Sequence, residues 1–394
     1  MNMNRCMNIL TVVLIMIIMP MMIYAAPSIS GASGNVAHGQ NVVVTGSSFG
    51  VKSSAAPVIW DNCSGTNITD KWSGGWPNVA SSSYNMNYRT PVQVGRNIPL
   101  PHSHITKYAT GCHVAGVYNS GQNVILWKNR TMSSFPQYTY VSWYERFDDN
   151  WKFGIADGGG TADDNLKAFD YSTGTSPYTM NSSTDSNWYL EWNARPLSKT
   201  DTNQGWHLND DGSSLNAYWP NNYAVNPMGG SWTKVEVEIC YTNQSSGYIK
   251  LWENGVLKQN YSGPTDKYSG TARNEGIGGF ARSKTPGNWR YYADMYLDYS
   301  RCRVIVGNAS TLTASTKREV QIPSAWSDGS ITVNVNQGAF SDGQTAYLYV
   351  VDSNGTVNSN GYQITFGKGG TTTPPTSDTT PPATPSGVTV TVIQ

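Results

Sequence analysis

Apolar and charged residues alternate most clearly between Trp232 and Tyr241, where Val235, Val237 and Ile239 are interleaved with Lys234, Glu236 and Glu238. A period of two is typical of a strand with one buried face. A second alternating run, residues 248–253, ends at an Asn-Gly pair, which is a strong hairpin signal. Two hairpin-linked strands cannot bury an apolar face by themselves, so the pattern predicts a partner sheet.

Similar short runs predict strands through the middle of the chain, and no helix of ordinary length is indicated. The expected strands are Val58–Asp61, His113–Tyr118, Asn123–Trp127, Thr139–Phe147, Leu166–Tyr171, Asn187–Ala194, Lys234–Tyr241, Tyr248–Trp252, Gly276–Phe280, Tyr291–Leu297 and Arg303–Val306. The predicted fold class is all-β: an antiparallel jelly-roll sandwich, accompanied by a smaller immunoglobulin-like β-sandwich.

Composition agrees with many short strands joined by turns, since the chain has 39 Gly, 14 Trp and 24 Tyr but only 13% charged residues. Lys and Arg number 26, and so do Asp and Glu. This balance gives no basic field, so neither nucleic acid nor an anionic membrane surface is an expected partner.

The N-terminus has the pattern of a secretory signal peptide over residues 1–26. Arg5 precedes an apolar run from Ile9 to Ile23, and the small residues Ala25 and Ala26 follow. The alternative is an uncleaved anchor, because the run approaches the length of a membrane span. We expect a secreted or cell-surface protein with no membrane span in the mature chain.

The run Gly247-Tyr-Ile-Lys-Leu-Trp-Glu-Asn-Gly255 after the alternating strand resembles the concanavalin/laminin-G-like jelly roll of the polysaccharide-lyase-like type. The resemblance covers residues 60–308 and implies an extracellular polysaccharide as partner. Residues 291–304, with the sequence YYADMYLDYSRCRV, are similar to the closing strands of that family.

Residues 38–50 resemble the opening of a TIG-type immunoglobulin-like domain, and residues 319–366 resemble its later strands. We therefore expect one TIG-like sandwich split between residues 27–59 and 309–367, with the jelly roll inserted. The alternative is two incomplete β modules. Residues 368–386 form a Pro/Thr/Gly linker, and residues 387–394 resemble the start of a fibronectin type III module, which implies further β domains beyond the C-terminus.

Polar and aromatic residues on the predicted outer strand faces are the candidate ligand-binding set: Tyr144, Arg146, Tyr189, Glu191, Asn193, Arg195 and Glu236. If these strands share one concave sheet, aromatic rings would stack on sugar rings while charged and amide groups would bond their hydroxyl or uronate groups. The alternative is an ordinary solvated face with cross-strand ion pairs.

The first rival function is a polysaccharide lyase or glycoside hydrolase on the same jelly roll. Arg146 with Tyr144 or Tyr189, or the histidines His102 and His104, supply residue types that a lyase needs. The motifs of jelly-roll alginate lyases and laminarinases are missing, so no catalytic residue is assigned. The second rival is an adhesion or architectural surface module without a small ligand.

No cofactor or metal is expected. His102 and His104 could clamp a metal but lack a nearby third ligand, and calcium at Asp148, Asp149, Asp157, Asp163 and Asp164 competes with plain Asp/Gly turns. The disulfide candidates are Cys63, Cys112, Cys240 and Cys302. Their pairing is left open, and buried free thiols are the alternative.

Overall fold

The fold is known from a computed structural model. It describes residues 25–76, 86–113, 122–131, 136–149, 165–173, 187–193, 205–210, 230–265, 272–281 and 288–367. These residues form almost only antiparallel strands, which confirms the all-β fold class. The described helices are the short α1 (Pro91–Val94), η1 (Ile68–Asp70) and η2 (Leu312–Ala314).

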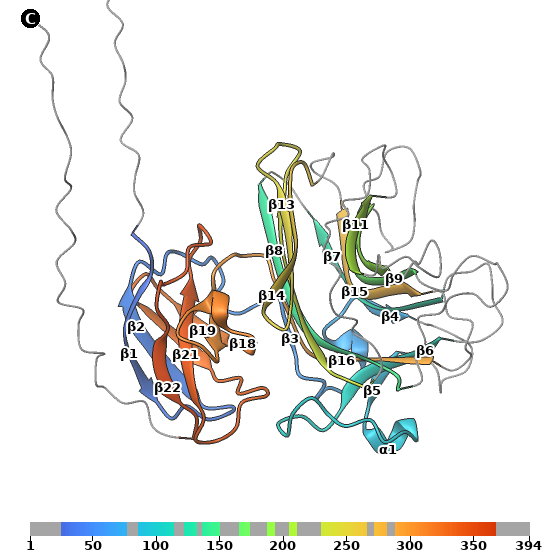
Figure 1. The fold of residues 1–394 in the computed structure, drawn as a ribbon, viewed down its shortest axis with the longest axis horizontal. Helices are drawn as coiled ribbons and strands as arrows, with labels where there is room; N and C mark the ends of the chain where they lie inside the picture. Colours follow the sequence, from blue (N-terminus) through green and yellow to red (C-terminus); the bar gives the residue numbers. More distant parts are fainter. Residues whose placement is uncertain are drawn as a thin grey trace, which may run out of the picture.

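Two sheets form the jelly roll in the middle of the chain (Figure 1). The eight-stranded sheet contains, in order, β14 (Val256–Ser262), β13 (Tyr248–Glu253), β12 (Thr233–Tyr241), β8 (Gln137–Phe147), β16 (Asn288–Asp298), β6 (Tyr108–His113) and β5 (Asn87–Arg89), with β3 (Ile59–Asp61) also paired to β16. The six-stranded sheet contains β11 (Gly205–Asp210), β10 (Asn187–Asn193), β9 (Asn165–Thr173), β15 (Ala272–Ala281), β7 (Gln122–Thr131) and β4 (Gly74–Trp76).

The core of the jelly roll lies between these two sheets, as the alternation predicts. Val237 and Leu251 are opposite each other on β12 and β13, and both are fully buried in this core. Trp143 of β8 stacks on Phe169 of β9, which joins one sheet to the other. Glu145 of β8 is also buried, and its carboxylate pairs with Arg290 at 2.5 Å.

A second, smaller sandwich packs beside the jelly roll and is built from both ends of the described chain (Figure 1). One sheet contains β1 (Ser28–Gly34), β2 (Asn41–Ser47), β20 (Ser330–Asn334) and β19 (Ile322–Trp326), and the other contains β18 (Arg318–Val320), β17 (Arg303–Gly307), β21 (Thr345–Val351) and β22 (Tyr362–Thr365). Because β2 pairs directly with β20, the segments before and after the jelly roll share one sheet and one apolar core.

One predicted boundary is wrong. The strand Arg303–Val306 was assigned to the jelly roll, but as β17 it pairs with β18 and β21 of the small sandwich. Its valines Val304 and Val306 belong to the core of that sandwich. The jelly roll therefore closes with β16, and the chain crosses into the small sandwich before Arg303.

The disulfide prediction is also corrected. Cys63, Cys240 and Cys302 are free, buried thiols. They lie in different environments, since Cys63 packs in the jelly-roll core against the Tyr292 carbonyl and Cys302 contacts the Val51 carbonyl. The side chain of the fourth candidate, Cys112, lies outside the described residues.

No helix within the described ranges is long and apolar enough to cross a membrane. The apolar run of residues 9–23, the Asp157, Asp163 and Asp164 calcium candidates, Arg195, and residues 368–394 fall outside those ranges.

Candidate functional site

The outer face of the eight-stranded sheet carries three of the predicted binding residues, Tyr144, Arg146 and Glu236. They were expected to line an open groove, but all three are buried, and Glu236 is only 3% exposed. Two elements cover this face: the small sandwich, and the segment of residues 95–107 between α1 and β6. The groove prediction is therefore wrong for this sheet.

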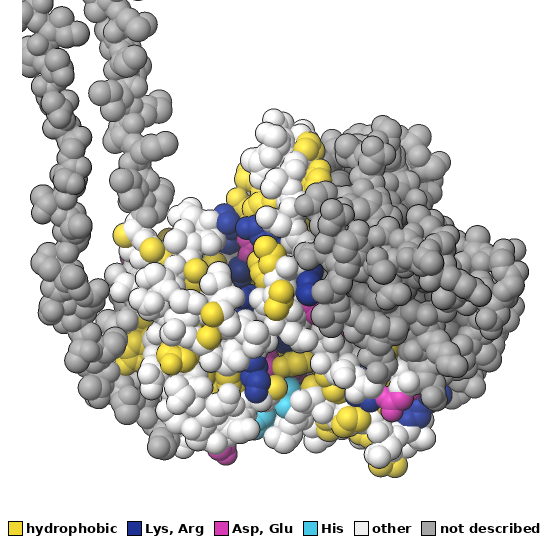
Figure 2. Space-filling view, viewed as in Figure 1, with side chains coloured by type: hydrophobic (Ala, Val, Ile, Leu, Met, Phe, Trp, Pro, Cys, Tyr) yellow, Lys and Arg dark blue, Asp and Glu magenta, His cyan; other side chains and the backbone are white. Residues whose placement is uncertain are grey.

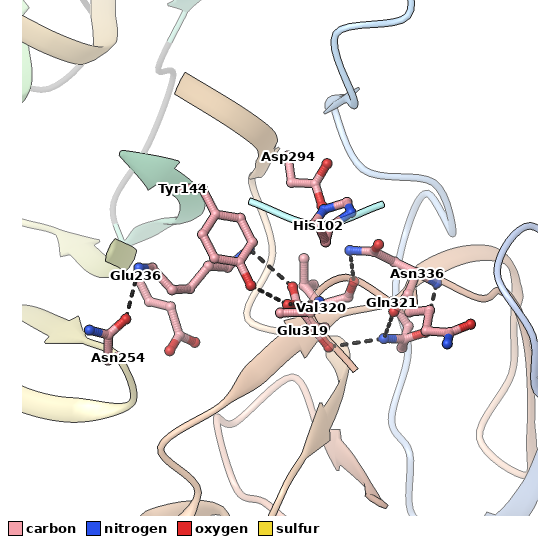
Figure 3. A network of polar contacts seen from close by, with 12 residues as sticks. His102, Tyr144, Glu236, Asn254, Asp294, Glu319, Val320, Gln321 and Asn336 are labelled. Carbon is pink, nitrogen blue, oxygen red and sulfur yellow. Dashed lines mark hydrogen bonds and ion pairs between the residues drawn. The ribbon is translucent and has the colours of Figure 1, made fainter. Parts of the chain in front are cut away.

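Glu319 of β18 connects the small sandwich to this face (Figure 3). Its carboxylate accepts hydrogen bonds from the Tyr144 hydroxyl and from the Ala339 amide at 3.1 Å, and it pairs with the Lys234 ammonium at 3.4 Å. Burial, followed by the nearby Glu319 carboxylate, raises the pKa of Tyr144 well above its ordinary value. Tyr144 is therefore held as a hydrogen-bond donor and is unsuited to act as a catalytic base.

The two glutamates of β12 are also neutralised by the small sandwich. Glu236 faces Arg318 at 3.6 Å, and Glu238 pairs with Arg303 at 2.7 Å. Figure 2 shows Lys and Arg side chains gathered along the boundary between the two sandwiches. The charged face that suggested a ligand site is thus a domain interface, in which each carboxylate has a partner from the other sandwich.

Arg146 and the first two calcium candidates lie together beyond this interface. Arg146 pairs with Asp149 at 2.5 Å and donates to the Gly230 carbonyl, while Asp148 pairs with Arg96. Each of these two carboxylates therefore has an arginine partner. No group of three His, Cys, Asp or Glu side chains among the described residues is arranged to hold a metal ion.

The six-stranded sheet has a different outer face. Three residues of this sheet point inward and belong to the jelly-roll core: Phe169, Tyr171 and Ile277. The residues that alternate with them, Asp170 and Gly276, therefore take the outer face. In the backbone register, one row of directly opposite positions crosses the whole sheet: Asn209, Tyr189, Asp170, Gly276, Trp127 and Gly74.

Among the described members of this row, Trp127 is half-buried and Asp170 is only 1% exposed. The Trp127 indole lies directly over Gly74, where a side chain would collide with the ring. Gly276 contributes no side chain between Trp127 and Asp170. A neighbouring row on the same face places Asn274 opposite Asn129. The arrangement combines one ring, one carboxylate and two amides around a glycine.

Three predicted binding residues, Tyr189, Glu191 and Asn193, lie on β10 of this sheet. The register puts Tyr189 opposite Asp170 and Glu191 opposite Lys167 and His207. The structure thus divides the predicted set between two sheets, which excludes a single groove containing all of it. Trp127, Asp170 and Asn274 were missed, although the alternation of Phe169, Asp170 and Tyr171 was a usable signal.

His102 and His104 lie where the segment of residues 95–107 meets the small sandwich. His102 Nε2 donates to Asp294 at 2.8 Å, and its Nδ1 accepts the His104 amide at 3.3 Å. Both ring nitrogens of His102 are engaged in protein hydrogen bonds, so this residue is not arranged as a metal ligand or a free base.

No protein-family model matches the chain, and no curated protein is similar to it in sequence. Among solved structures it is similar to an endo-β-1,4-glucuronan lyase from the fungus Trichoderma reesei (9% identity, TM-score 0.36, 60% of this chain and 94% of that one). It is also similar to a PL-14 alginate lyase from Aplysia kurodai (12%, 0.39, 58% and 91%) and to lectin II from Ulex europaeus (11%, 0.30, 49% and 87%). Likenesses this distant carry no conclusion about what this chain binds.

Proposed function

We propose that this is a secreted or cell-surface protein that binds extracellular polysaccharide on the outer face of its six-stranded sheet. The observation that carries the proposal is the row of Asn209, Tyr189, Asp170, Gly276, Trp127 and Gly74 across all six strands. At about 4.8 Å between neighbouring strands the row spans about 24 Å, which is long enough for several linked sugar rings.

The chemistry of this outer face suits sugars. An indole ring offers an apolar face on which the C–H face of a pyranose can stack. The Asn129 amide, which is exposed, can accept or donate hydrogen bonds to hydroxyl groups, whereas Asp170 and Asn274 are buried, each only 1% exposed. A site with a few polar groups around an aromatic platform is the usual composition of a small-molecule or sugar site.

The eight-stranded sheet has another role in this proposal. Its outer face holds the small sandwich through buried ion pairs, which leaves the six-stranded face as the proposed binding face. The TIG-like and fibronectin-like segments would act as spacers that display the jelly roll at the cell surface or in the extracellular space.

The test is binding of the full chain to a panel of neutral and acidic polysaccharides, measured by affinity electrophoresis and calorimetry. Trp127→Ala should weaken binding at least about tenfold, because a binding hot spot of this type costs roughly 1–2 kcal/mol or more. Tyr347→Ala in the small sandwich is the matched aromatic control and should bind like the wild type. Each variant is first checked for an unchanged unfolding midpoint.

Binding that is equally strong in the wild type and in Trp127→Ala would overturn the assignment of the face. If the folded protein binds no polysaccharide of the panel, the adhesion or architectural role is favoured. New unsaturated or reducing ends that disappear in Asp170→Asn would make the protein a lyase or hydrolase, the rival function, acting at the same face.

A further inference from the structure

Three histidines meet at the boundary between the two sandwiches. His38 belongs to the connection between β1 and β2 of the small sandwich, whereas His102 and His104 belong to the segment of residues 95–107, which we term the strap. The rings of His38 and His104 stack across the boundary with centroids 4.3 Å apart and an interplanar angle of 16°. Figure 2 shows histidine side chains near the surface along this boundary.

The hydrogen bonds of the cluster require neutral rings. His38 Nδ1 accepts the Gln337 amide at 3.4 Å, and His102 Nδ1 accepts the His104 amide at 3.3 Å. A proton on either nitrogen would point a donor at a donor and break that bond. Both bonds hold backbone at the boundary, one in the small sandwich and one in the strap.

The carboxylates around the cluster are already engaged. Asp294 accepts from His102 at 2.8 Å, and Asp342 accepts from the Gln337 side chain at 2.8 Å. Lys317 Nζ lies over the Phe340 ring, 5.1 Å from its centroid. Two protonated rings in the stack would repel each other, and Asp294 and Asp342 would offset only part of this repulsion.

Solvent can reach the cluster. A pocket of about 360 Å³ opens beside it, lined by residues 101–104 of the strap and residues 337–342 of the small sandwich. Burial, and then the neighbouring imidazole of His104, lowers the pKa of His38; burial, and then His102, lowers the pKa of His104. Asp294 opposes both changes, and Asp342 opposes the change at His104.

We propose that this cluster is an acid-sensitive latch between the strap and the small sandwich. With neutral rings, the His38–His104 stack closes the boundary. When both rings take up protons from solvent, they repel each other, the Gln337 amide loses its acceptor, and the strap separates from residues 337–342. The buried ion pairs Lys234–Glu319, Arg318–Glu236 and Arg303–Glu238 join β12 to the small sandwich and do not involve the strap, so the two sandwiches stay joined while the pocket widens.

The direction of the pH dependence follows from linkage. The closed latch binds fewer protons than the open one because the closed state lowers the pKa of His38 and His104. Closure is therefore complete above the ordinary histidine pKa of about 6.5 and is lost as the pH falls below it.

The test is hydrogen exchange of the full chain between about pH 7.5 and pH 5, a window centred on histidine titration. Exchange is expressed as protection factors so that the intrinsic pH dependence cancels. In the wild type, protection of residues 101–104 and 337–342 should be lost on acidification, while β12 and β16 stay protected. His104→Phe, which keeps a ring in the stack but takes no proton, should retain protection at the lower pH.

His104→Gln is the second variant, for the case that Phe does not fit, and should also retain protection in acid. His207→Gln in the six-stranded sheet is the control and should lose protection like the wild type. The latch is refuted if wild-type protection at the boundary does not change with pH. It is equally refuted if a folded His104 variant loses protection as the wild type does.

Discussion

Replacing Glu319 should destabilise the protein more than any substitution at its exposed surface. This carboxylate is fully buried and serves three groups at once: the Tyr144 hydroxyl, the Ala339 amide and the Lys234 ammonium. Glu319→Ala leaves a buried lysine without its counter-charge and a buried hydroxyl without its acceptor. Both losses act at the junction of the two sandwiches.

The expected cost can be worked from the geometry. At 3.4 Å between Lys234 Nζ and Glu319 Oε2, the gross attraction is about 5 kcal/mol with an effective dielectric constant of 20. Desolvation offsets much of this in the intact pair, but removal of one partner of a buried pair costs roughly 3–5 kcal/mol. Lys234→Met combined with Glu319→Met should cost clearly less than Glu319→Ala, because no buried charge is then left alone.

The assay is equilibrium urea unfolding of the wild type, Glu319→Ala and the Lys234→Met/Glu319→Met double variant, followed by tryptophan fluorescence and circular dichroism. Tyr144→Phe is the matched control, and it should cost about 1–2 kcal/mol because it removes only one hydrogen bond. A loss below about 1 kcal/mol in Glu319→Ala would refute the buried-pair reasoning. So would a double variant that is less stable than the single variant.

Three further outcomes are expected. Gly338→Ala should cost about 3 kcal/mol in urea unfolding, because φ is +52° and the new Cβ would lie 2.1 Å from the Glu319 carboxyl carbon; Gly343→Ala, with φ +77° and open space, should cost only about 1 kcal/mol. Burial opposes ionisation of Glu238, but Arg303 holds the pKa of this carboxyl below its ordinary value. The stability that this pair contributes above about pH 4.3 is therefore lost as the pH falls through the lowered pKa. Arg303→Met should make the unfolding free energy depend less on pH in this acid range. The three buried thiols should react with iodoacetamide only after unfolding, and labelling of the native protein would contradict their burial.

The strands were predictable because their inner faces follow a simple rule. Val237 and Leu251 lie in the core, as the alternation in residues 234–251 requires. The use of the outer face was not predictable in the same way. A row of Lys and Glu has the same pattern whether it faces water or the arginines of another domain, and only the tertiary structure supplies Arg303 and Arg318 opposite that row.

The same limit of local periodicity applies to the candidate site. Period two predicts which residues of a strand share a face, but it cannot say that β10 and β8 belong to different sheets. That assignment depends on the strand pairing: β10 pairs with its chain neighbours β9 and β11, whereas β8 pairs with β12 and β16, which are distant in the sequence. Pairings across a hundred residues leave no trace in local periodicity.

The charged interface and the proposed binding face lie on the two opposite outer faces of the jelly roll. A two-layer sandwich has two outer faces, and here the small sandwich occupies one of them with pairs such as Arg303–Glu238 and Lys52–Asp298. Charged pairs penalise misaligned docking, because a shifted interface would bring like charges together or leave buried charges without a partner. The small sandwich is therefore held in one orientation. Figure 1 places it on the opposite side of the eight-stranded sheet from the six-stranded sheet, and its last strand, β22, lies on that far side. The row of Trp127 and Asp170 belongs to the six-stranded sheet, on the other side of the eight-stranded sheet from the small sandwich.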